Sequence, residues 1–144
     1  MSLAKVLLVD DEVPFVETMV KRLSRRDFDL LTAYSGQEAL DVMERDPRVD
    51  VVILDVKMPG IDGIETLKEI KLRYPLVEVI MLTAHATVES AIDGMKLGAF
   101  DYLMKPAEMD QLVDKVKRAE NIKRHKEERI AEAQAMDIYH RRGD

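Results

Sequence analysis

The chain has 144 residues, 47% of them hydrophobic, with a formal net charge of −6 and no cysteine. This length suits one domain with a buried core. The lack of cysteine excludes a disulfide framework, a thiolate metal site and a cysteine nucleophile. The amino terminus reaches Asp10 after only a few apolar residues, which predicts neither a signal peptide nor a membrane span. We therefore expect a cytoplasmic protein that makes no membrane contact.

Five short apolar runs predict strands buried on both faces. They are rich in Val, Ile and Leu, as parallel strands covered by helices are. The runs cover residues 5–10, 28–35, 49–56, 76–84 and 99–106.

Amphipathic segments between and after these runs predict five helices. Each has apolar residues at helical spacing and residues suited to a first turn or a cap. The helices are expected to begin near Pro14 (with Asp11 or Glu12 as cap), Ser35, Ile64, Val88 and Glu108. Alternating strands and helices predict an α/β fold with a parallel sheet covered on both faces.

Polar side chains stand at the points where the predicted strands end. The set consists of Asp10, Asp11, Asp55, Thr83 and Lys105. Ligands of open α/β sheets bind beyond the carboxyl ends of the strands. We therefore expect these side chains to form one site.

Three carboxylates at one sheet edge repel one another unless a cation lies between them. Magnesium is the expected ion, with manganese as the alternative, because magnesium prefers oxygen ligands and pairs carboxylates with phosphate oxygens. Asp55 follows a central apolar run and is the expected nucleophile, which would form an acyl phosphate. Lys105 and Thr83 are expected to meet the charge of the phosphoryl group.

Four motifs in this order and spacing resemble the receiver domains of two-component response regulators. They are LLVDDE (7–12), VILDVKMPGIDG (52–63), MLTAHA (81–86) and DYLMKP (101–106), and the resemblance covers residues 4 to about 120. It implies a doubly wound, flavodoxin-like, five-stranded sheet of order 2-1-3-4-5. Residues 88–106 look most similar to receivers that precede ATPase output domains in transcriptional activators.

The resemblance implies a magnesium-dependent transfer to Asp55 from the phosphohistidine of a sensor histidine kinase. Asp10, Asp11, Asp55 and the backbone carbonyl of Lys57 would bind the ion. The product would be a signalling state that decays slowly by self-hydrolysis, so the protein is not expected to be a turnover enzyme. His85, together with Lys57, would flank the path of the hydrolytic water.

The same resemblance implies a conformational switch. Lys105 would contact the phosphoryl oxygens, Thr83 would move toward them, and Tyr102 would turn inward. The Lys105–Pro106 peptide bond would be cis. The face formed by the fourth helix, fifth strand and fifth helix would then change its affinity for a partner or for a second copy.

Ordinary structural roles remain open for these residues. Asp10 and Asp11 could cap the first helix, Thr83 could be a β-branched strand residue, and Tyr102 could be a half-buried aromatic. A hydrolase of the haloacid dehalogenase type also uses magnesium and an aspartate nucleophile, but it expects a second aspartate two residues after that nucleophile, and the first-strand pair here is adjacent. A receiver-like domain that binds partners without phosphorylation is a third interpretation, against which the intact polar set counts.

The carboxyl-terminal segment is more basic than the rest. Residues 115–129 hold 7 Lys+Arg against 3 Asp+Glu, whereas residues 1–114 hold 13 against 22. We expect residues 1–122 to form the receiver and residues 123–144 to form a helical extension or a linker to an output domain. This helix is either solvated or a dimerising helix. No helix-turn-helix pattern and no aromatic interleaving accompany its charges, so we expect no direct nucleic-acid contact by this chain.

Overall fold

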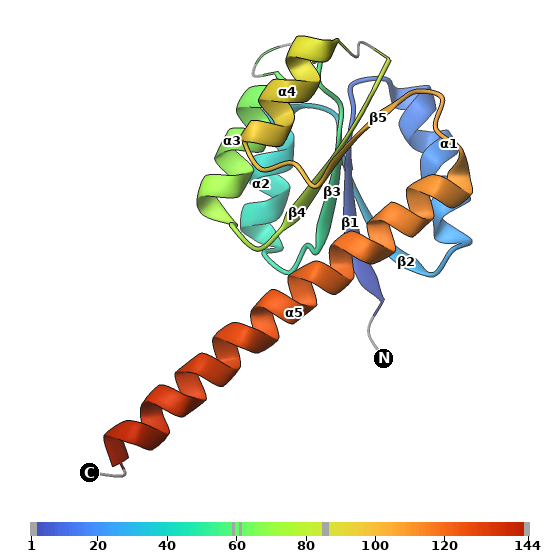
Figure 1. The fold of residues 1–144 in the computed structure, drawn as a ribbon. Helices are drawn as coiled ribbons and strands as arrows, with labels where there is room; N and C mark the ends of the chain where they lie inside the picture. The colour runs from blue at the N-terminus through green and yellow to red at the C-terminus, as the bar shows by residue number, and fades with distance from the viewer. Residues whose placement is uncertain (1–2, 59, 61, 85–86, 143–144) are drawn as a thin grey trace.

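The computed structural model describes residues 3–58, 60, 62–84 and 87–142, which form one parallel sheet flanked by helices (Figure 1). The strand order β2-β1-β3-β4-β5 confirms the predicted doubly wound fold. The strands are β1 (Ala4–Val9), β2 (Phe28–Ala33), β3 (Val51–Leu54), β4 (Glu78–Thr83) and β5 (Asp101–Met104). Each strand ends one or two residues before its predicted run ends, because the chain leaves the sheet where polar or turn residues begin.

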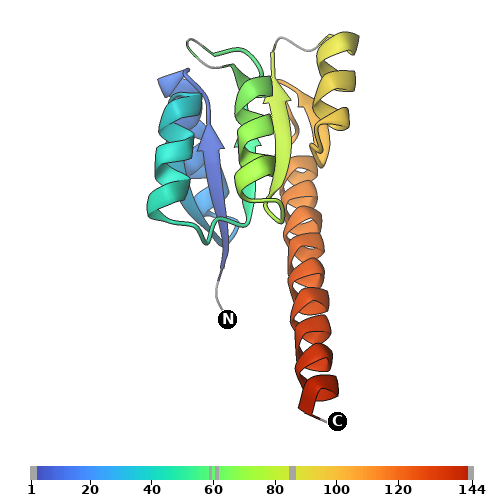
Figure 2. The same cartoon turned by 90° about the vertical axis from the view of Figure 1, so that its left-hand side faces the viewer.

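Five helices cover the two faces of this sheet. They are α1 (Val13–Ser24), α2 (Gly36–Arg45), α3 (Gly63–Arg73), α4 (Val88–Lys96) and α5 (Met109–Arg142). Helices α1 and α5 lie on one face, and α2, α3 and α4 lie on the other (Figures 1 and 2). No helix in the described ranges is long and apolar enough to cross a lipid bilayer.

Alternate residues of each central strand enter two separate cores. In β1, Leu7 and Val9 pack toward α2 and α3, whereas Val6 and Leu8 pack toward α1 and α5. All four are at most 1% exposed. Burial on both faces explains why these strands are almost continuously apolar in sequence.

The helix starts combine expected and unexpected caps. Ser35 caps α2 as predicted, because its side chain accepts the N–H of Glu38 at 3.1 Å. Helix α1 has Glu12 at its cap position, but the Glu12 side chain makes no capping hydrogen bond. Instead, Asp10 Oδ1 accepts the Glu12 N–H at 2.9 Å. The structure therefore confirms Glu12 as the cap residue by position, without a capping bond from its side chain.

Helix α4 has the predicted helical spacing, but its larger apolar side chains face outward. Val88 is 79% exposed, and Ile92 and Met95 are each 48% exposed. The buried residue of this helix is Gly94. A Cβ at Gly94 would lie 3.7 Å from side-chain atoms of Met81 and of Tyr102. The helix thus approaches the sheet through its smallest residue, which leaves the Val, Ile and Met side chains to form an exposed surface.

Replacing Gly94 with Ala is expected to raise the free energy of unfolding by about 1 kcal/mol, because Gly in a helix interior costs about that much relative to Ala. The added methyl group would make ordinary van der Waals contacts. Urea denaturation measures the change, and the melting temperature should rise by about 3 °C.

The matched control for this change is Gly98→Ala at the end of the same helix. Gly98 has φ of +98°, where an L side chain costs about 1–2 kcal/mol. The free energy of unfolding is therefore expected to rise in Gly94→Ala and to fall in Gly98→Ala, although the two positions are only four residues apart. A loss of stability in Gly94→Ala would contradict the packing described for α4.

Candidate functional site

The carboxyl edge of the sheet brings together side chains from the ends of β1, β3, β4 and β5. Asp10 follows β1 and donates its backbone N–H to Ala33 O at 3.1 Å, and Asp55 follows β3 and donates its N–H to Val9 O at 3.0 Å. These backbone bonds extend the parallel ladder just past the strands and hold both carboxylates in place. Asp10 is 1% exposed and Asp55 is 2% exposed.

Three carboxylates meet at this edge. One ligand oxygen from each of Asp10, Asp11 and Asp55 lies within 4.8 Å of the others. Asp11 is exposed, so the cluster has two buried members and one that faces solvent. Such a set of hard oxygen donors with one open side suits a divalent cation that keeps some of its water.

In the described part of the chain, Lys105 forms ion pairs with both buried carboxylates. Its Nζ lies 2.6 Å from Asp10 Oδ2, 3.9 Å from Asp55 Oδ2 and 3.4 Å from Glu12 Oε1. The ammonium also stands 3.9 Å from the centre of the Phe15 ring, a favourable cation–π distance. Glu12 and Phe15 were not predicted as site residues. Glu12 lies within the LLVDDE motif, but its distance to Lys105 depends on how the loop folds.

Burial and charge oppose one another in this cluster. Burial raises the pKa of Asp10, and the charge of Asp55 adds to this effect, although hydrogen bonds from Lys105 and from the Glu12 N–H act against it. Burial disfavours the ammonium of Lys105, but its hydrogen bond to Asp10 and the nearby carboxylates outweigh burial and raise its pKa. One ammonium therefore leaves the buried carboxylates only partly compensated, and an added cation would complete the compensation.

The surroundings of one Asp55 oxygen test whether the site fits a cation and a phosphoryl group. Among the described residues, Asp55 Oδ1 is a buried side-chain oxygen that accepts no hydrogen bond. Buried polar atoms without a partner are uncommon, since each costs about 1–3 kcal/mol. The orphan oxygen, the three-carboxylate cluster and the adjacent ammonium together fit a magnesium ion and a phosphoryl group.

The turn after β3 holds Asp55 through a close backbone approach. Gly63, the first residue of α3, donates its N–H to Val56 O at 2.7 Å. A Cβ at Gly63 would lie 2.0 Å from the Asp55 carbonyl oxygen. Gly60, with φ of +80°, supplies the left-handed residue of the same turn. The turn therefore depends on both glycines, on Gly60 for its positive φ and on Gly63 for its close approach to the backbone of Asp55.

Thr83 and Lys105 arrive from neighbouring strand ends, as predicted. Thr83 is the last residue of β4 and is fully buried. Its carbonyl accepts the Lys105 N–H at 2.9 Å. The Lys105–Pro106 peptide bond is cis, as the family resemblance implied.

Tyr102 lies half-buried in β5 beside α4. Its hydroxyl is 2.7 Å from Ser90 Oγ. Ser90 also forms a reciprocal capping box with Thr87 at the start of α4. The Thr-x-x-Ser spacing was a sequence signal for this cap, but the bond to Tyr102 could not be foreseen from it.

The remaining predicted residues are placed only in part. Lys57 lies in the loop after β3 with an exposed side chain, and the role of its backbone carbonyl as a metal ligand stays a prediction. His85 lies outside the described residues.

A family model described as the response regulator receiver domain matches residues 6–117. The chain belongs to this family. Receiver domains are the signalling phosphoacceptors of two-component systems, and this membership confirms the function class expected from the four motifs.

Relatives of this receiver include much longer proteins. A putative NtrX-like response regulator from Rickettsia felis is 39% identical over 132 residues, which cover 90% of this chain and 28% of the relative. The transcriptional regulatory protein ZraR from Salmonella typhimurium is 39% identical over 114 residues, which cover 79% of this chain and 26% of ZraR. The receiver thus spans about a quarter of the length of these proteins.

Solved structures agree with the fold. A response regulator receiver domain from Clostridium thermocellum has a TM-score of 0.81 and 39% identity, with 85% of this chain and 98% of that chain covered. NtrX from Brucella abortus has a TM-score of 0.81 and 31% identity, with 88% of this chain and 29% of that chain covered.

Proposed function

We propose that Asp55 of this receiver accepts a phosphoryl group from the phosphohistidine of a sensor histidine kinase. An oxygen of Asp55 would attack phosphorus in line, the P–N bond to the imidazole would break, and an aspartyl phosphate would form. The observation that carries this proposal is the buried Asp55 Oδ1, which accepts no hydrogen bond in the described part of the chain.

Asp10, Asp11, Asp55 and the backbone carbonyl of Lys57 would hold magnesium. When bound, the ion would neutralise charge on the transferred phosphoryl group. The distances among the three carboxylates support this ligand set, and the chemistry of hard oxygen donors favours magnesium or manganese.

Lys105 and Thr83 would bind the phosphoryl oxygens after transfer. The Lys105 ammonium, 3.9 Å from Asp55 Oδ2, needs only a small displacement to leave Asp10 for a phosphoryl oxygen. The phosphoryl group is a partner for Lys105 and Thr83 that exists in one state only, so it favours the conformation in which both residues bind it. Self-hydrolysis would return the receiver slowly to its starting state, with Lys57 and His85 tuning the rate.

The switch would pass from Thr83 through Tyr102 to helix α4. Inward rotation of Tyr102 would break its 2.7 Å hydrogen bond to Ser90, a residue that also caps α4. The exposed apolar residues beside it, Val88, Ile92 and Met95 on α4 and Met104 on β5, suit a partner or a second copy with an apolar surface. In a longer regulator, this change would control transcription through an output domain connected to the part of α5 beyond residue 122.

Phosphorylation by acetyl phosphate tests the assignment directly. Incubation with magnesium is expected to add one phosphoryl group to the protein, measured by intact mass. Asp55→Asn, or chelation of magnesium, should abolish the adduct. Asp41→Asn, which changes an exposed aspartate of α2, should leave it unchanged. An adduct that persists in Asp55→Asn would contradict the proposal, no adduct in the native protein would favour a partner-binding domain without phosphorylation, and continuous turnover would favour a hydrolase.

A further inference from the structure

The amino edge of the sheet, opposite the phosphoacceptor site, carries a second group of charged side chains. Asp50 directly precedes β3, and Glu78 is the first residue of β4. Glu78 and Lys123 of α5 are both buried. None of these residues takes part in the proposed phosphoryl chemistry. Burying a charged side chain costs free energy unless the charge is paired.

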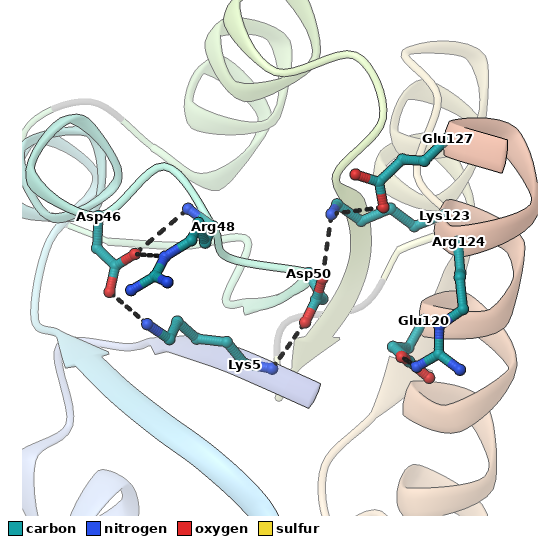
Figure 3. Close-up of polar contacts among 8 residues, drawn as sticks. All are labelled: Lys5, Asp46, Arg48, Asp50, Glu120, Lys123, Arg124 and Glu127. Carbon is teal, nitrogen blue, oxygen red and sulfur yellow. Dashed lines mark hydrogen bonds and ion pairs between the residues drawn. The ribbon is translucent and has the colours of Figure 1, made fainter. Parts of the chain in front are cut away.

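Asp50 connects three elements at this edge (Figure 3). Its Oδ2 accepts the backbone N–H of Lys5 in β1 at 2.8 Å, and its Oδ1 accepts from Lys123 Nζ at 3.0 Å. The Asp50 backbone donates to Lys5 O at 2.9 Å and accepts from Glu78 N at 3.3 Å. Because β1 and β4 hold Asp50 on both sides, the helix that binds its carboxylate is fixed to the sheet.

Two lysines of one helical turn reach this edge. Lys123 Nζ binds Asp50 and also Glu127 Oε1, at 3.1 Å. Burial disfavours the Lys123 charge, but these hydrogen bonds outweigh burial and raise its pKa. Lys126 Nζ lies 3.1 Å from Glu78 Oε1, on a carboxylate that is only 5% exposed. The two ion pairs therefore join α5 to the starts of two adjacent strands.

We propose that Asp50, Glu78, Lys123 and Lys126 form a clamp that extends the receiver's rigid unit through Glu127 and sets the direction in which α5 leaves the domain. Apolar packing of α5 in the core extends to Ala119, and beyond this residue a single ion pair would let the helix pivot about one point. Anchors on two strands restrain both its tilt and its rotation. The boundary expected at residue 122 therefore moves about one helical turn toward the carboxyl terminus.

Beyond the clamp, α5 becomes a projecting arm. Residues 128–138 are all exposed, and the helix runs on away from the sheet (Figures 1 and 2). Residues 128–142 correspond to about 22 Å of helix at 1.5 Å per residue. A tilt of about 10° at the clamp would move the tip of such a rigid arm by about 4 Å. A small tilt at the clamp would thus produce a larger displacement at the tip of the arm and at any domain bound there.

Distance measurements between two spin labels test the clamp. The chain has no cysteine, so Glu44→Cys on α2 and Ala135→Cys on the arm provide two unique exposed labelling sites. Double electron–electron resonance should give a narrow distance distribution for the native clamp. The double change Lys123→Met and Lys126→Met is expected to widen it at least twofold. Lys117→Met, an equivalent change at an exposed position of α5 outside the clamp, should leave the width unchanged.

Amide hydrogen exchange separates loss of the clamp from loss of the fold. In the double variant, amides of residues 123–127 should exchange at least tenfold faster while those of β1 and β3 stay protected. An unchanged label distribution in the double variant would overturn the proposal. If β1 and β3 also lose protection, Lys126→Met alone decides, because that side chain is 47% exposed and its loss is tolerated more easily. Twofold widening in this single variant then supports the clamp, and an unchanged width overturns it.

Discussion

Replacing Lys105 with Met is expected to lower the free energy of unfolding by about 3 kcal/mol when no divalent cation is added, since removing one partner of a buried ion pair typically costs that much. The Lys105 ammonium lies 2.6 Å from Asp10 and 3.9 Å from Asp55, and both carboxylates are almost fully buried. Without Lys105, two buried negative charges would face one another with little compensation. Met preserves most of the side-chain volume, so the effect reports on charge rather than on a cavity.

Magnesium should recover much of this loss, because it supplies the missing positive charge at the same carboxylates. Urea denaturation with and without magnesium measures both effects. The pKa of Lys105 is raised above its ordinary value of 10.5, so its contribution is present at neutral pH and is lost only as pH rises through the folded value. Lys21→Met, at an exposed position of α1 away from the site, is the control and should change neither curve. Equal unfolding midpoints for Lys105→Met and the native protein would contradict the role of this ammonium.

The sheet and the position of the site could be predicted because both depend on local sequence patterns. Continuous apolar runs identify strands buried on two faces, and a polar residue after such a run must lie at the carboxyl edge of a parallel sheet. Asp10, Asp55, Thr83 and Lys105 all follow this rule, and the structure places them together. Strand order is not local in this sense, and it came from the resemblance to a family.

Contacts that depend on helix orientation could not be predicted in this way. Helical spacing located α4 but could not say which side of the helix meets the sheet, because Gly94 allows a closer approach than the apolar residues beside it. The bond between Ser90 and Tyr102 depends on that approach. The ion pair of Asp50 and Lys123 joins residues 73 positions apart, and only the path of α5 across the sheet brings them together. The close approach of Gly63 to the Asp55 carbonyl likewise depends on how tightly α3 folds back toward β3.

Replacing Asp10 with Asn is expected to have opposite effects in the absence and presence of magnesium. Without a divalent cation, the free energy of unfolding should rise by about 1 kcal/mol, as is common when a functional site is relieved of unfavourable charge. Burial raises the pKa of Asp10, so its ionised form is less favourable in the folded protein than in the unfolded chain. In Asp10→Asn, the Lys105 ammonium would turn toward Asp55 Oδ2, which lies 3.9 Å from it in the native protein.

The dependence on pH follows from the direction of the pKa shift. Between the ordinary value of 3.8 and the raised folded value, the native state keeps a proton that the unfolded chain has released. Stability from this group therefore falls as pH rises through that window. The advantage of Asp10→Asn should be complete above the window and shrink as pH falls toward 3.8. Denaturation curves at several pH values, without magnesium, measure this difference.

Magnesium should reverse the order of the two proteins. Binding at one hundred times the dissociation constant stabilises a folded protein by about 2.7 kcal/mol, and Asp10→Asn would lose most of this gain because it lacks one buried ligand. Asp41→Asn, an exposed change on α2, should show neither the gain without magnesium nor the loss with it. If Asp10→Asn keeps the full magnesium stabilisation, Asp10 is not a ligand, and the metal must bind through the other proposed ligands. If Asp10→Asn is more stable than the native protein without magnesium and less stable with it, Asp10 destabilises the metal-free protein and stabilises the metal-bound one. This is the behaviour expected of a metal ligand.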